Sequence, residues 1–134
     1  MPYQEYNLFL DDLRDPATVY PGEEWVVVRS YDAFVHHITQ HGRPAAISFD
    51  NDLGCDEHGA SLPDGIAAIK WLSEWGLVVP AIYIHSDNLV ASEFIESYAK
   101  TWHKILALDG LLDPSQSQVR RHSALHRKWN VPRV

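Results

Sequence analysis

The stretch AAISFDND at residues 45–52 decides the fold, because an apolar run ends there in acidic side chains. Its first five residues carry no charge and predict a buried β-strand. Asp50 follows that run directly, and Asp52 comes two residues later. The run NLFL at residues 7–10 has the same pattern and ends in a second pair of carboxylates, Asp11 and Asp12. Like charges at the ends of two buried strands repel each other, so a stabilising partner is expected nearby.

Strands and helices alternate along most of the chain. Two further apolar segments predict strands at 24–30 and 81–86, and helical periodicity predicts helices at 30–42, 63–76 and 91–106. Strands that are apolar on both faces, separated by amphipathic helices, predict a mainly parallel sheet covered on both sides. Because crossovers between parallel strands are right-handed, the predicted fold class is a doubly wound α/β sheet of four or five strands.

Two segments depart from this alternation. The segment DLRDPATVYPGE at 12–23 contains two prolines and a glycine, so a loop is expected where the first helix would stand. After Leu106 the helical pattern weakens, and the sequence LDGLLDPSQS is typical of turns. One more helix is predicted at 116–129. Residues 101–134 are therefore expected to form a helical extension, with a basic tail, of a single domain that spans residues 1–134.

Periodicity also predicts which large side chains are buried. The apolar faces of the helices include four aromatic residues that are expected in the core: Trp71, Trp75, Phe94 and Trp102. Five histidines show no spacing typical of metal ligands and are expected at the surface: His36, His37, His41, His58 and His103. Cys55 lies in a loop without a defined histidine partner, so it is not predicted to be a nucleophile.

Composition favours a soluble cytoplasmic protein. The 134 residues are 46% apolar and include one cysteine, which suits a single domain in a reducing compartment. The start of the sequence lacks the pattern of a secretory signal. No apolar run approaches the ~20 residues of a membrane helix, so no membrane association is expected.

The formal net charge of −7 is unevenly distributed along the chain. From Val119 onward there is no acid, and there are five basic residues: Arg120, Arg121, Arg127, Lys128 and Arg133. Such a segment can contact RNA through its phosphates. More often it forms a solvated helix or pairs with the acidic surface of the same protein. The sequence alone leaves both interpretations open, and it does not indicate an oligomeric state.

Polar clusters follow three of the predicted strands. In a doubly wound sheet the binding site lies at the carboxyl ends of the strands, which brings Asp11, Asp12 and Asp50 near residues 85–88. Carboxylates at neighbouring strand ends come within reach of one another, and a hard divalent cation, Mg²⁺ or Mn²⁺ above all, would remove their repulsion. The alternative is that Asp11 and Asp52 cap turns and only Asp50 is buried.

Several motifs resemble a known family. LFLDD, SFDNDLG and IHS are similar to the motifs of two-component receiver domains, and LFLDDLRDP, WVVVRSYDAF and IHSDN resemble more specifically the cyclic-phosphate-processing receiver domains. The resemblance covers about residues 7–100 and implies a receiver or flavodoxin-like fold. It also implies an enzymatic role, the opening of a cyclic phosphate on RNA ends or nucleotides. No fifth strand ending in the lysine of receiver domains is evident, and Lys104 lies within a predicted helix.

The resemblance carries over onto particular residues. It implies that Asp11, Asp12 and Asp50 hold the divalent cation and that Asp50 corresponds to the phosphoacceptor of receiver domains. Ser86 corresponds to the hydroxyl residue of that site. Ser86 and Asn88 are then expected to bind phosphate or ribose, although both residue types are also common in turns.

Opening a cyclic phosphate further requires groups that move protons and bind phosphoryl oxygens. His85 is the candidate general acid or base, with Asp50 and Asp52 as the other candidate catalytic residues. Arg14 offers hydrogen-bond donors to the phosphate. His85 could instead be a hydrogen-bonded core residue, and Arg14 could pair with nearby acids. The expected function is a metal-dependent phosphoesterase; the alternatives are a signalling module phosphorylated on Asp50 and a module that binds a phosphorylated ligand without turnover.

Overall fold

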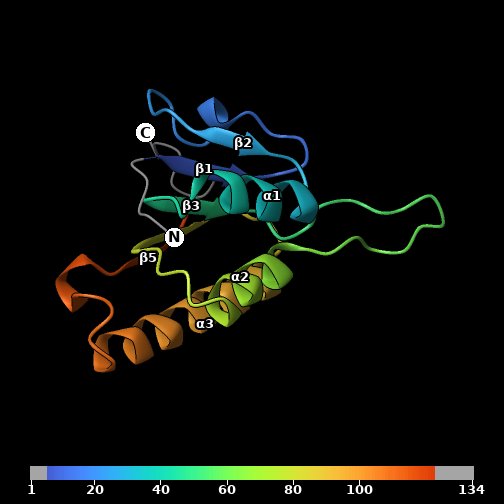
Figure 1. The fold of residues 1–134 in the computed structure, drawn as a ribbon. Coiled ribbons are helices and arrows are strands. Elements are labelled where there is room, and N and C mark those ends of the chain that lie inside the picture. Colours follow the sequence, from blue (N-terminus) through green and yellow to red (C-terminus); the bar gives the residue numbers. More distant parts are fainter. Residues whose placement is uncertain (1–5, 123–134) are drawn as a thin grey trace, which may run out of the picture.

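The computed structural model describes residues 6–122. Its strands form one sheet: β1 (Asn7–Leu10), β2 (Val26–Val28), β3 (Ala46–Phe49), β4 (Ala81–Ile84) and β5 (Gln118–Arg121). The strand order is β2-β1-β3-β4-β5, and every neighbouring pair is parallel (Figure 1). This order confirms the predicted α/β fold of the receiver or flavodoxin-like type.

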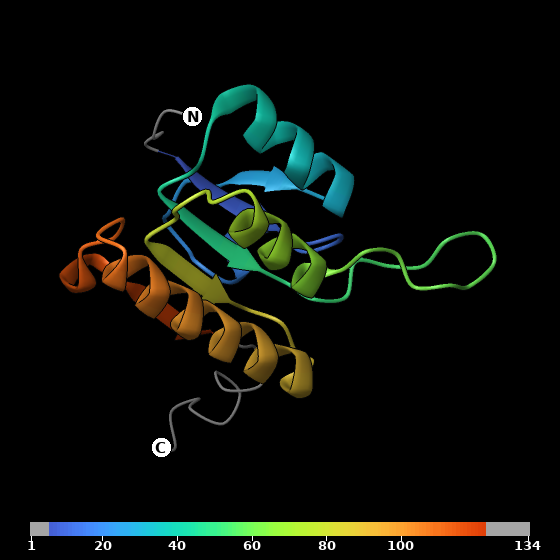
Figure 2. The same cartoon turned by 60° about the horizontal axis from the view of Figure 1, so that its bottom comes forward.

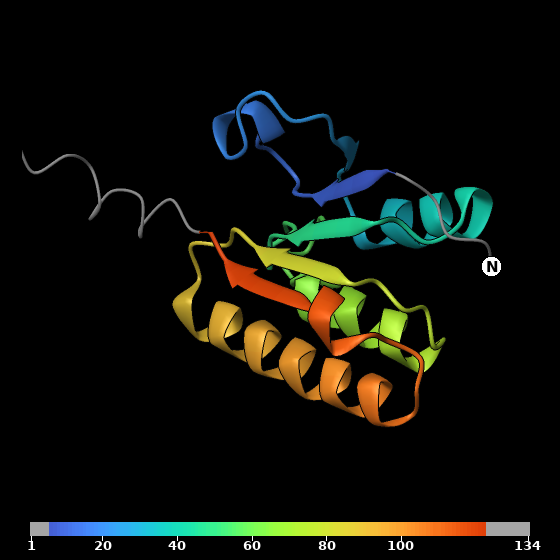
Figure 3. The same cartoon turned by 90° about the vertical axis from the view of Figure 1, so that its left-hand side faces the viewer.

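Three α-helices pack on one face of the sheet (Figures 2 and 3): α1 (Tyr31–His41), α2 (Gly65–Glu74) and α3 (Leu89–Leu108). Right-handed connections explain this arrangement, because the chain moves in one direction across the sheet from β2 through β3 and β4 to β5. The hydrophobic core lies between this face and the helices, and its fully buried side chains include Leu8, Ile47, Ile82, Ile69 and Ile95. No helix in the described part of the chain has both the length and the apolar character needed to cross a membrane.

The connection from β1 to β2 runs in the opposite direction and therefore crosses the other face of the sheet (Figure 3). It contains the short 3-10 helix η1 (Pro16–Thr18) and no α-helix, which confirms the predicted loop. Tyr20 and Trp25 of this connection stack with ring centroids 4.8 Å apart. Both rings lie edge-on to Phe9 of β1. An aromatic loop thus covers the face that the helices leave uncovered.

Each α-helix begins at a side chain that accepts a hydrogen bond from the first turn. The N-cap residues of α1, α2 and α3 are Ser30, Asp64 and Asn88. Such caps satisfy backbone N–H groups that have no partner within the helix. Because α2 follows β3 and α3 follows β4, their capped ends lie at the carboxyl edge of the sheet, where the acidic motifs also lie.

The C-terminal region differs from the predicted helix at 116–129. Gln118–Arg121 forms strand β5 beside β4, so the prediction is wrong for these residues, and residues 123–129 lie outside the described part of the chain. The helix α3 ends at Leu108, and the 3-10 helix η2 (Pro114–Gln116) leads into β5. Residues 101–122 thus contain the end of α3, the 3-10 helix η2 and strand β5, and are not a helical extension throughout. Periodicity missed β5 because only Val119 of this edge strand is half-buried, so it has no apolar alternation.

Three predictions of burial were wrong. Trp75 is 71% exposed at the end of α2, and Phe94 is 43% exposed on α3. His103 is buried, and its ring nitrogens contact Ser117 Oγ and the carbonyl oxygen of Val79. Trp102 is buried as predicted. Periodicity indicates which residues share one face of a helix. How much of that face is buried depends on which other helices and strands pack against it.

Candidate functional site

Three carboxylates meet at the carboxyl edge of the sheet. Asp11 and Asp12 follow β1, and Asp50 follows the neighbouring strand β3. One oxygen of each side chain lies within 4.8 Å of the corresponding oxygens of the other two. The two strands pair with Leu10 opposite Phe49, so both end at the same level of the sheet. The predicted convergence of the three acids is confirmed.

Asp11 is tightly held by hydrogen bonds. Its Oδ1 accepts from the backbone N–H groups of Leu13 and Arg14, at 2.8 and 2.9 Å. Its Oδ2 lies 3.0 Å from Nε2 of His85. Burial would raise the pKa of Asp11, but the hydrogen bonds from His85 and the two backbone groups lower it to about 2. Asp11 is therefore an ionised carboxylate at neutral pH.

The pKa of Asp50 is shifted in the opposite direction from that of Asp11. Its side chain is buried, and burial together with the negative charge of Asp11 raises the pKa of Asp50 to about 7. The charge of Arg14 and hydrogen bonds from Asn51 and Ser86 only partly offset these effects. Negative charge at this position is therefore incompletely compensated by the protein's own groups.

The donor set of the cluster suits a hard divalent cation. Carboxylate oxygens are the ligands that Mg²⁺ and Mn²⁺ prefer. The raised pKa of Asp50 indicates a place where added positive charge would stabilise the ionised form. Asp11, Asp12 and Asp50 could therefore hold a divalent ion, as the corresponding acids do in receiver domains.

His85 lies in the interior of the protein, with 0% of its surface exposed. Its Nε2 is 3.0 Å from Asp11 Oδ2, and its Nδ1 is 2.7 Å from Ser48 Oγ. The ring stacks on Phe9 with centroids 4.4 Å apart. Burial lowers the pKa of His85, although the hydrogen bond to Asp11 opposes this effect. His85 is thus a neutral imidazole whose two nitrogens are both engaged inside the protein.

Arg14 folds back over the cluster from the β1–β2 connection. Its Nη1 donates to the carbonyl oxygen of His85 at 2.8 Å, and its Nη2 donates to Asp87 Oδ2 at 2.6 Å. Its Nε lies 3.8 Å from Asp11 Oδ2. The side chain is 30% exposed, and a guanidinium keeps further N–H donors beyond these two hydrogen bonds. Arg14 therefore places a partly accessible cation beside the acids.

The remaining predicted residues occupy different positions. Ser86 is buried, hydrogen-bonds to Asp50 and accepts from the backbone N–H of Asn88 at 3.1 Å. The Asn88 side-chain oxygen caps α3 by accepting from Ala91 N at 3.0 Å. Asp52 is exposed at the start of the arm formed by residues 51–64, which projects from the sheet (Figure 1). Only Ser86 of these three directly contacts the acidic cluster.

Sequence reasoning missed four residues that shape the site: Tyr20, Ser48, Asn51 and Asp87. The buried Asn51 accepts a hydrogen bond from the backbone N–H of Ile66, which ties the end of β3 to the first turn of α2. The serine inside the apolar run at 45–49 was a usable signal, because a buried hydroxyl needs a partner. No local pattern marked Tyr20, whose hydroxyl lies 2.7 Å from Ser48 Oγ across 28 residues of sequence.

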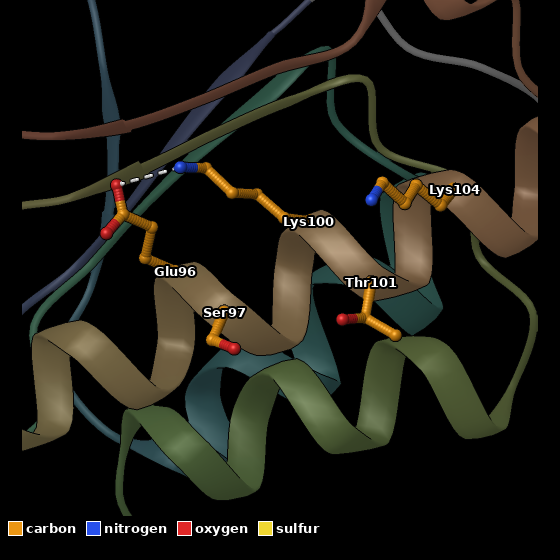
Figure 4. A pocket seen from close by; sticks show the side chains of 5 residues that line it. All are labelled: Glu96, Ser97, Lys100, Thr101 and Lys104. Carbon is orange, nitrogen blue, oxygen red and sulfur yellow. Dashed lines mark ion pairs between the residues drawn. The ribbon is translucent and has the colours of Figure 1, made fainter.

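Arg121, in the described part of the basic C-terminal segment, contacts the protein's own acidic surface. Arg121 Nε lies 3.2 Å from Glu96 Oε1, and Lys100 Nζ lies 3.5 Å from Glu96 Oε2. Figure 4 shows the second pair beside a shallow depression of about 290 Å³ along α3, lined also by Lys104. For Arg121, the interpretation as a partner of the protein's own acids is confirmed. The other basic residues of the tail after Arg121 lie outside the described residues.

Comparison with known proteins identifies the family. No curated protein and no solved structure matches the chain significantly. A family model for the cyclic-phosphate processing receiver domain matches residues 6–101, which include the three acids and every other predicted site residue. The chain belongs to the family of cyclic-phosphate processing receiver domains.

Proposed function

We propose that the protein is a metal-dependent phosphoesterase that opens a cyclic phosphate on an RNA end or a nucleotide. The observation that carries this proposal is the placement of three carboxylates and Arg14 at one edge of the sheet. The carboxylates suit a divalent cation, and the guanidinium suits phosphate oxygens. Family membership supports a cyclic phosphate as the substrate class.

The reaction adds water across one phosphorus–oxygen bond of the ring. The water oxygen forms a bond to phosphorus and gives up one proton, one of the two ring ester bonds breaks, and the departing oxygen takes up a proton from solvent water. Asp11, Asp12 and Asp50 would hold the divalent cation, which supplies charge stabilisation at the phosphoryl oxygens and a more acidic bound water.

The chain's own groups have separate tasks in this proposal. Arg14 binds a phosphoryl oxygen with the donors left beyond its bonds to His85 and Asp87. Asp52, which is exposed, accepts the proton of the attacking water. Asn88 binds the ribose or phosphate through its amide N–H groups, because only its side-chain oxygen serves the cap of α3.

Two predicted residues act through their neighbours. Ser86 holds Asp50 by a hydrogen bond from its hydroxyl. His85 has no exposed atom and donates to Asp11, so we assign it to positioning Asp11 and not to direct proton exchange with the substrate. This replaces the general acid or base role expected from its position in the motif.

Turnover of cyclic phosphates tests the proposed function directly. Substrates would be 2′,3′-cyclic nucleotides and short RNAs with a 2′,3′-cyclic end, each assayed with Mg²⁺, with Mn²⁺ and with EDTA. We expect ring opening only with a cation, and a loss of about 10³-fold or more in Asp50→Ala, because the cluster then lacks a central ligand. The ratio of 2′- to 3′-phosphate in the product shows which ester bond breaks.

A matched control for this assay is Glu96→Ala, which removes a carboxylate on α3 that pairs with Lys100 and Arg121 outside the cluster. Its activity should equal that of the unsubstituted protein. Activity that persists in EDTA or in Asp50→Ala would refute metal dependence. Absence of turnover across the whole panel would refute the phosphoesterase.

Arg14→Gln is expected to lower kcat/KM by about 10²-fold or more while leaving Mn²⁺ affinity nearly unchanged. The substitution removes the cation that faces the phosphoryl oxygens but none of the three carboxylates. Steady-state kinetics and calorimetric titration with Mn²⁺ measure the two effects separately. Lys70→Gln removes an exposed cation from α2 and is the control for a change in overall charge. Equal losses in both variants would contradict a specific role for Arg14.

The hydrogen bond between Ser86 and Asp50 favours a second candidate function, receiver-type signalling through phosphorylation of Asp50. Against it, β5 ends in Arg121, which pairs with Glu96, and not in the lysine of receiver domains. Treatment with acetyl phosphate and Mg²⁺, followed by intact mass measurement, distinguishes the two functions. A phosphoryl adduct on the unsubstituted protein that is absent from Asp50→Ala would support signalling.

A further inference from the structure

A chain of hydrogen bonds runs from the acidic cluster through the sheet to its second face. Asp11 Oδ2 lies 3.0 Å from His85 Nε2, and His85 Nδ1 lies 2.7 Å from Ser48 Oγ. Ser48 Oγ in turn lies 2.7 Å from the hydroxyl oxygen of Tyr20. His85 and Ser48 are completely buried. These four residues are called the buried relay below.

The direction of each hydrogen bond in the buried relay follows from taking Asp11 as a cation ligand, because a carboxyl group binds a metal ion in its ionised form. A carboxylate can only accept, so the imidazole proton must reside on Nε2 of His85. The neutral ring then has a lone pair on Nδ1, which accepts from the hydroxyl of Ser48. The hydroxyl of Tyr20 therefore donates to Ser48 Oγ. Every donor in the relay points toward Asp11.

Ser48 of the buried relay has aromatic neighbours within the sheet. Ser48 lies in the middle of the sheet, with Phe9 and Tyr83 opposite it in register on the adjacent strands. Burying a hydroxyl and an imidazole costs free energy unless both are hydrogen-bonded. The stacking of His85 on Phe9, at 8° between the ring planes, fixes the imidazole so that Nε2 meets Asp11. The relay therefore ends in a hydrogen-bond donor to the buried Asp11 carboxylate, which an apolar side chain could not provide.

We propose that Tyr20, Ser48 and His85 are positioning residues that hold the Asp11 carboxylate in the orientation needed to bind a divalent cation. The inference rests on the proposed function only in taking Asp11 as a cation ligand. Partners that hydrogen-bond to a metal ligand typically change metal affinity 10–100-fold. Tyr20 belongs to the β1–β2 connection, so the loop that covers the second face is linked to the cation site by this chain of contacts.

Calorimetric titration of the full chain with Mn²⁺ tests the positioning role. Ser48→Ala should weaken Mn²⁺ binding by about 10-fold or more, because His85 Nδ1 loses its donor and the ring is free to change its protonated nitrogen. Tyr20→Phe keeps the aromatic packing and removes the hydroxyl that donates to Ser48, so we expect a smaller loss of about 3-fold. If Ser48→Ala does not fold, the Mn²⁺ affinity of Tyr20→Phe still tests the positioning role.

The chain offers a matched control in Tyr98→Phe. It breaks a hydrogen bond between tyrosine and serine hydroxyls, Tyr98 to Ser73, that lies between α3 and α2 away from the cluster. This variant should keep the Mn²⁺ affinity of the unsubstituted protein. Thermal unfolding in EDTA gives the stability cost of each variant. Equal destabilisation of Tyr20→Phe and Tyr98→Phe with unchanged Mn²⁺ affinity in both would overturn the proposal.

A second readout needs neither cation nor substrate. The nitrogen chemical shifts of the His85 ring should show a neutral imidazole protonated on Nε2, and Ser48→Ala should lose this preference. A ring protonated on Nδ1 would overturn the relay. If the unsubstituted protein binds no Mn²⁺, the positioning role and the metal site fail together. Mn²⁺ binding that depends on Ser48, combined with no turnover of any cyclic phosphate, would support the relay and refute the phosphoesterase.

Discussion

Asp50→Asn is expected to stabilise the cation-free protein by about 2 kcal/mol near pH 7.5, while abolishing its ability to bind a divalent cation. Burial and the charge of Asp11 raise the pKa of Asp50 from 3.8 to about 7. In the folded protein the ionised carboxylate is therefore unfavourable, and asparagine fills the same space without a charge. If replacing a residue in a binding site stabilises the protein, that residue serves function and not stability.

The pH dependence of this effect has a definite sign. A carboxyl group whose pKa is raised by folding binds its proton more tightly in the folded state. The stabilisation that this tighter proton binding gives the folded state is complete below the unfolded pKa of 3.8. It is lost as the pH rises to the folded pKa of about 7. The advantage of Asp50→Asn should therefore grow between about pH 4 and pH 7 and level off above. At 1.36 kcal/mol per pKa unit the upper limit is about 4 kcal/mol.

Urea unfolding in EDTA at several pH values measures the difference between the two proteins. Asp52→Asn is the matched control, because this neighbouring carboxylate is exposed and its neutralisation should change stability by less than about 0.5 kcal/mol. Added Mg²⁺ should stabilise the unsubstituted protein and leave Asp50→Asn unchanged. An Asp50→Asn protein that is less stable than the unsubstituted one near neutral pH in EDTA would contradict the charge repulsion at this site.

Gly65→Ala is expected to destabilise the protein by about 3 kcal/mol or more. Gly65 is the first residue of α2, and a Cβ placed on it would lie 2.3 Å from the Asp50 carbonyl oxygen and 3.0 Å from Asn51 Cα. Both contacts are with backbone atoms, which cannot rotate away as a side chain would. Either the first turn of α2 or the backbone of Asp50 must move, so cation affinity should fall as well.

Gly22→Ala separates this steric effect from backbone strain. Gly22 has φ of 84°, where an alanine is strained, but a Cβ there would meet no atom within 4 Å. Strain alone costs about 1–2 kcal/mol. Urea unfolding of both variants, with Mn²⁺ titration of Gly65→Ala, measures the two effects. A loss of unfolding free energy in Gly65→Ala that is no larger than the loss in Gly22→Ala would contradict the proposed steric requirement for glycine at position 65.

The acidic edge of the sheet was predictable from local patterns. A strand covered on both faces must be apolar, so the change to acidic residues at 11 and 50 locates two strand ends. Parallel connections then place both ends at one edge. The convergence of Asp11, Asp12 and Asp50 therefore follows from the sequence once the strands are recognised.

The fifth strand could not be recognised in this way. Gln118–Arg121 lies at the edge of the sheet, and its only partly buried side chain is that of Val119. A strand of this kind is stabilised by backbone pairing with β4, which requires no apolar side chains of its own. Its pattern of charged and apolar residues is also compatible with a helix. Pairing with the otherwise free edge of β4 decides that the segment forms a strand.

By itself, the sequence determined the parallel sheet and the acidic edge, because hydrophobic periodicity and chain connectivity are local properties. Only the tertiary structure decided where the His85 side chain lies. A histidine at a strand end can face solvent as an acid or base, or point inward as a hydrogen-bonded core residue. Here Ser48, 37 residues away, and Asp11, 74 residues away, bind its two nitrogens, and Tyr20 completes the network. Such contacts between distant segments exist only in the folded chain, since no local pattern encodes which side chains meet across a sheet.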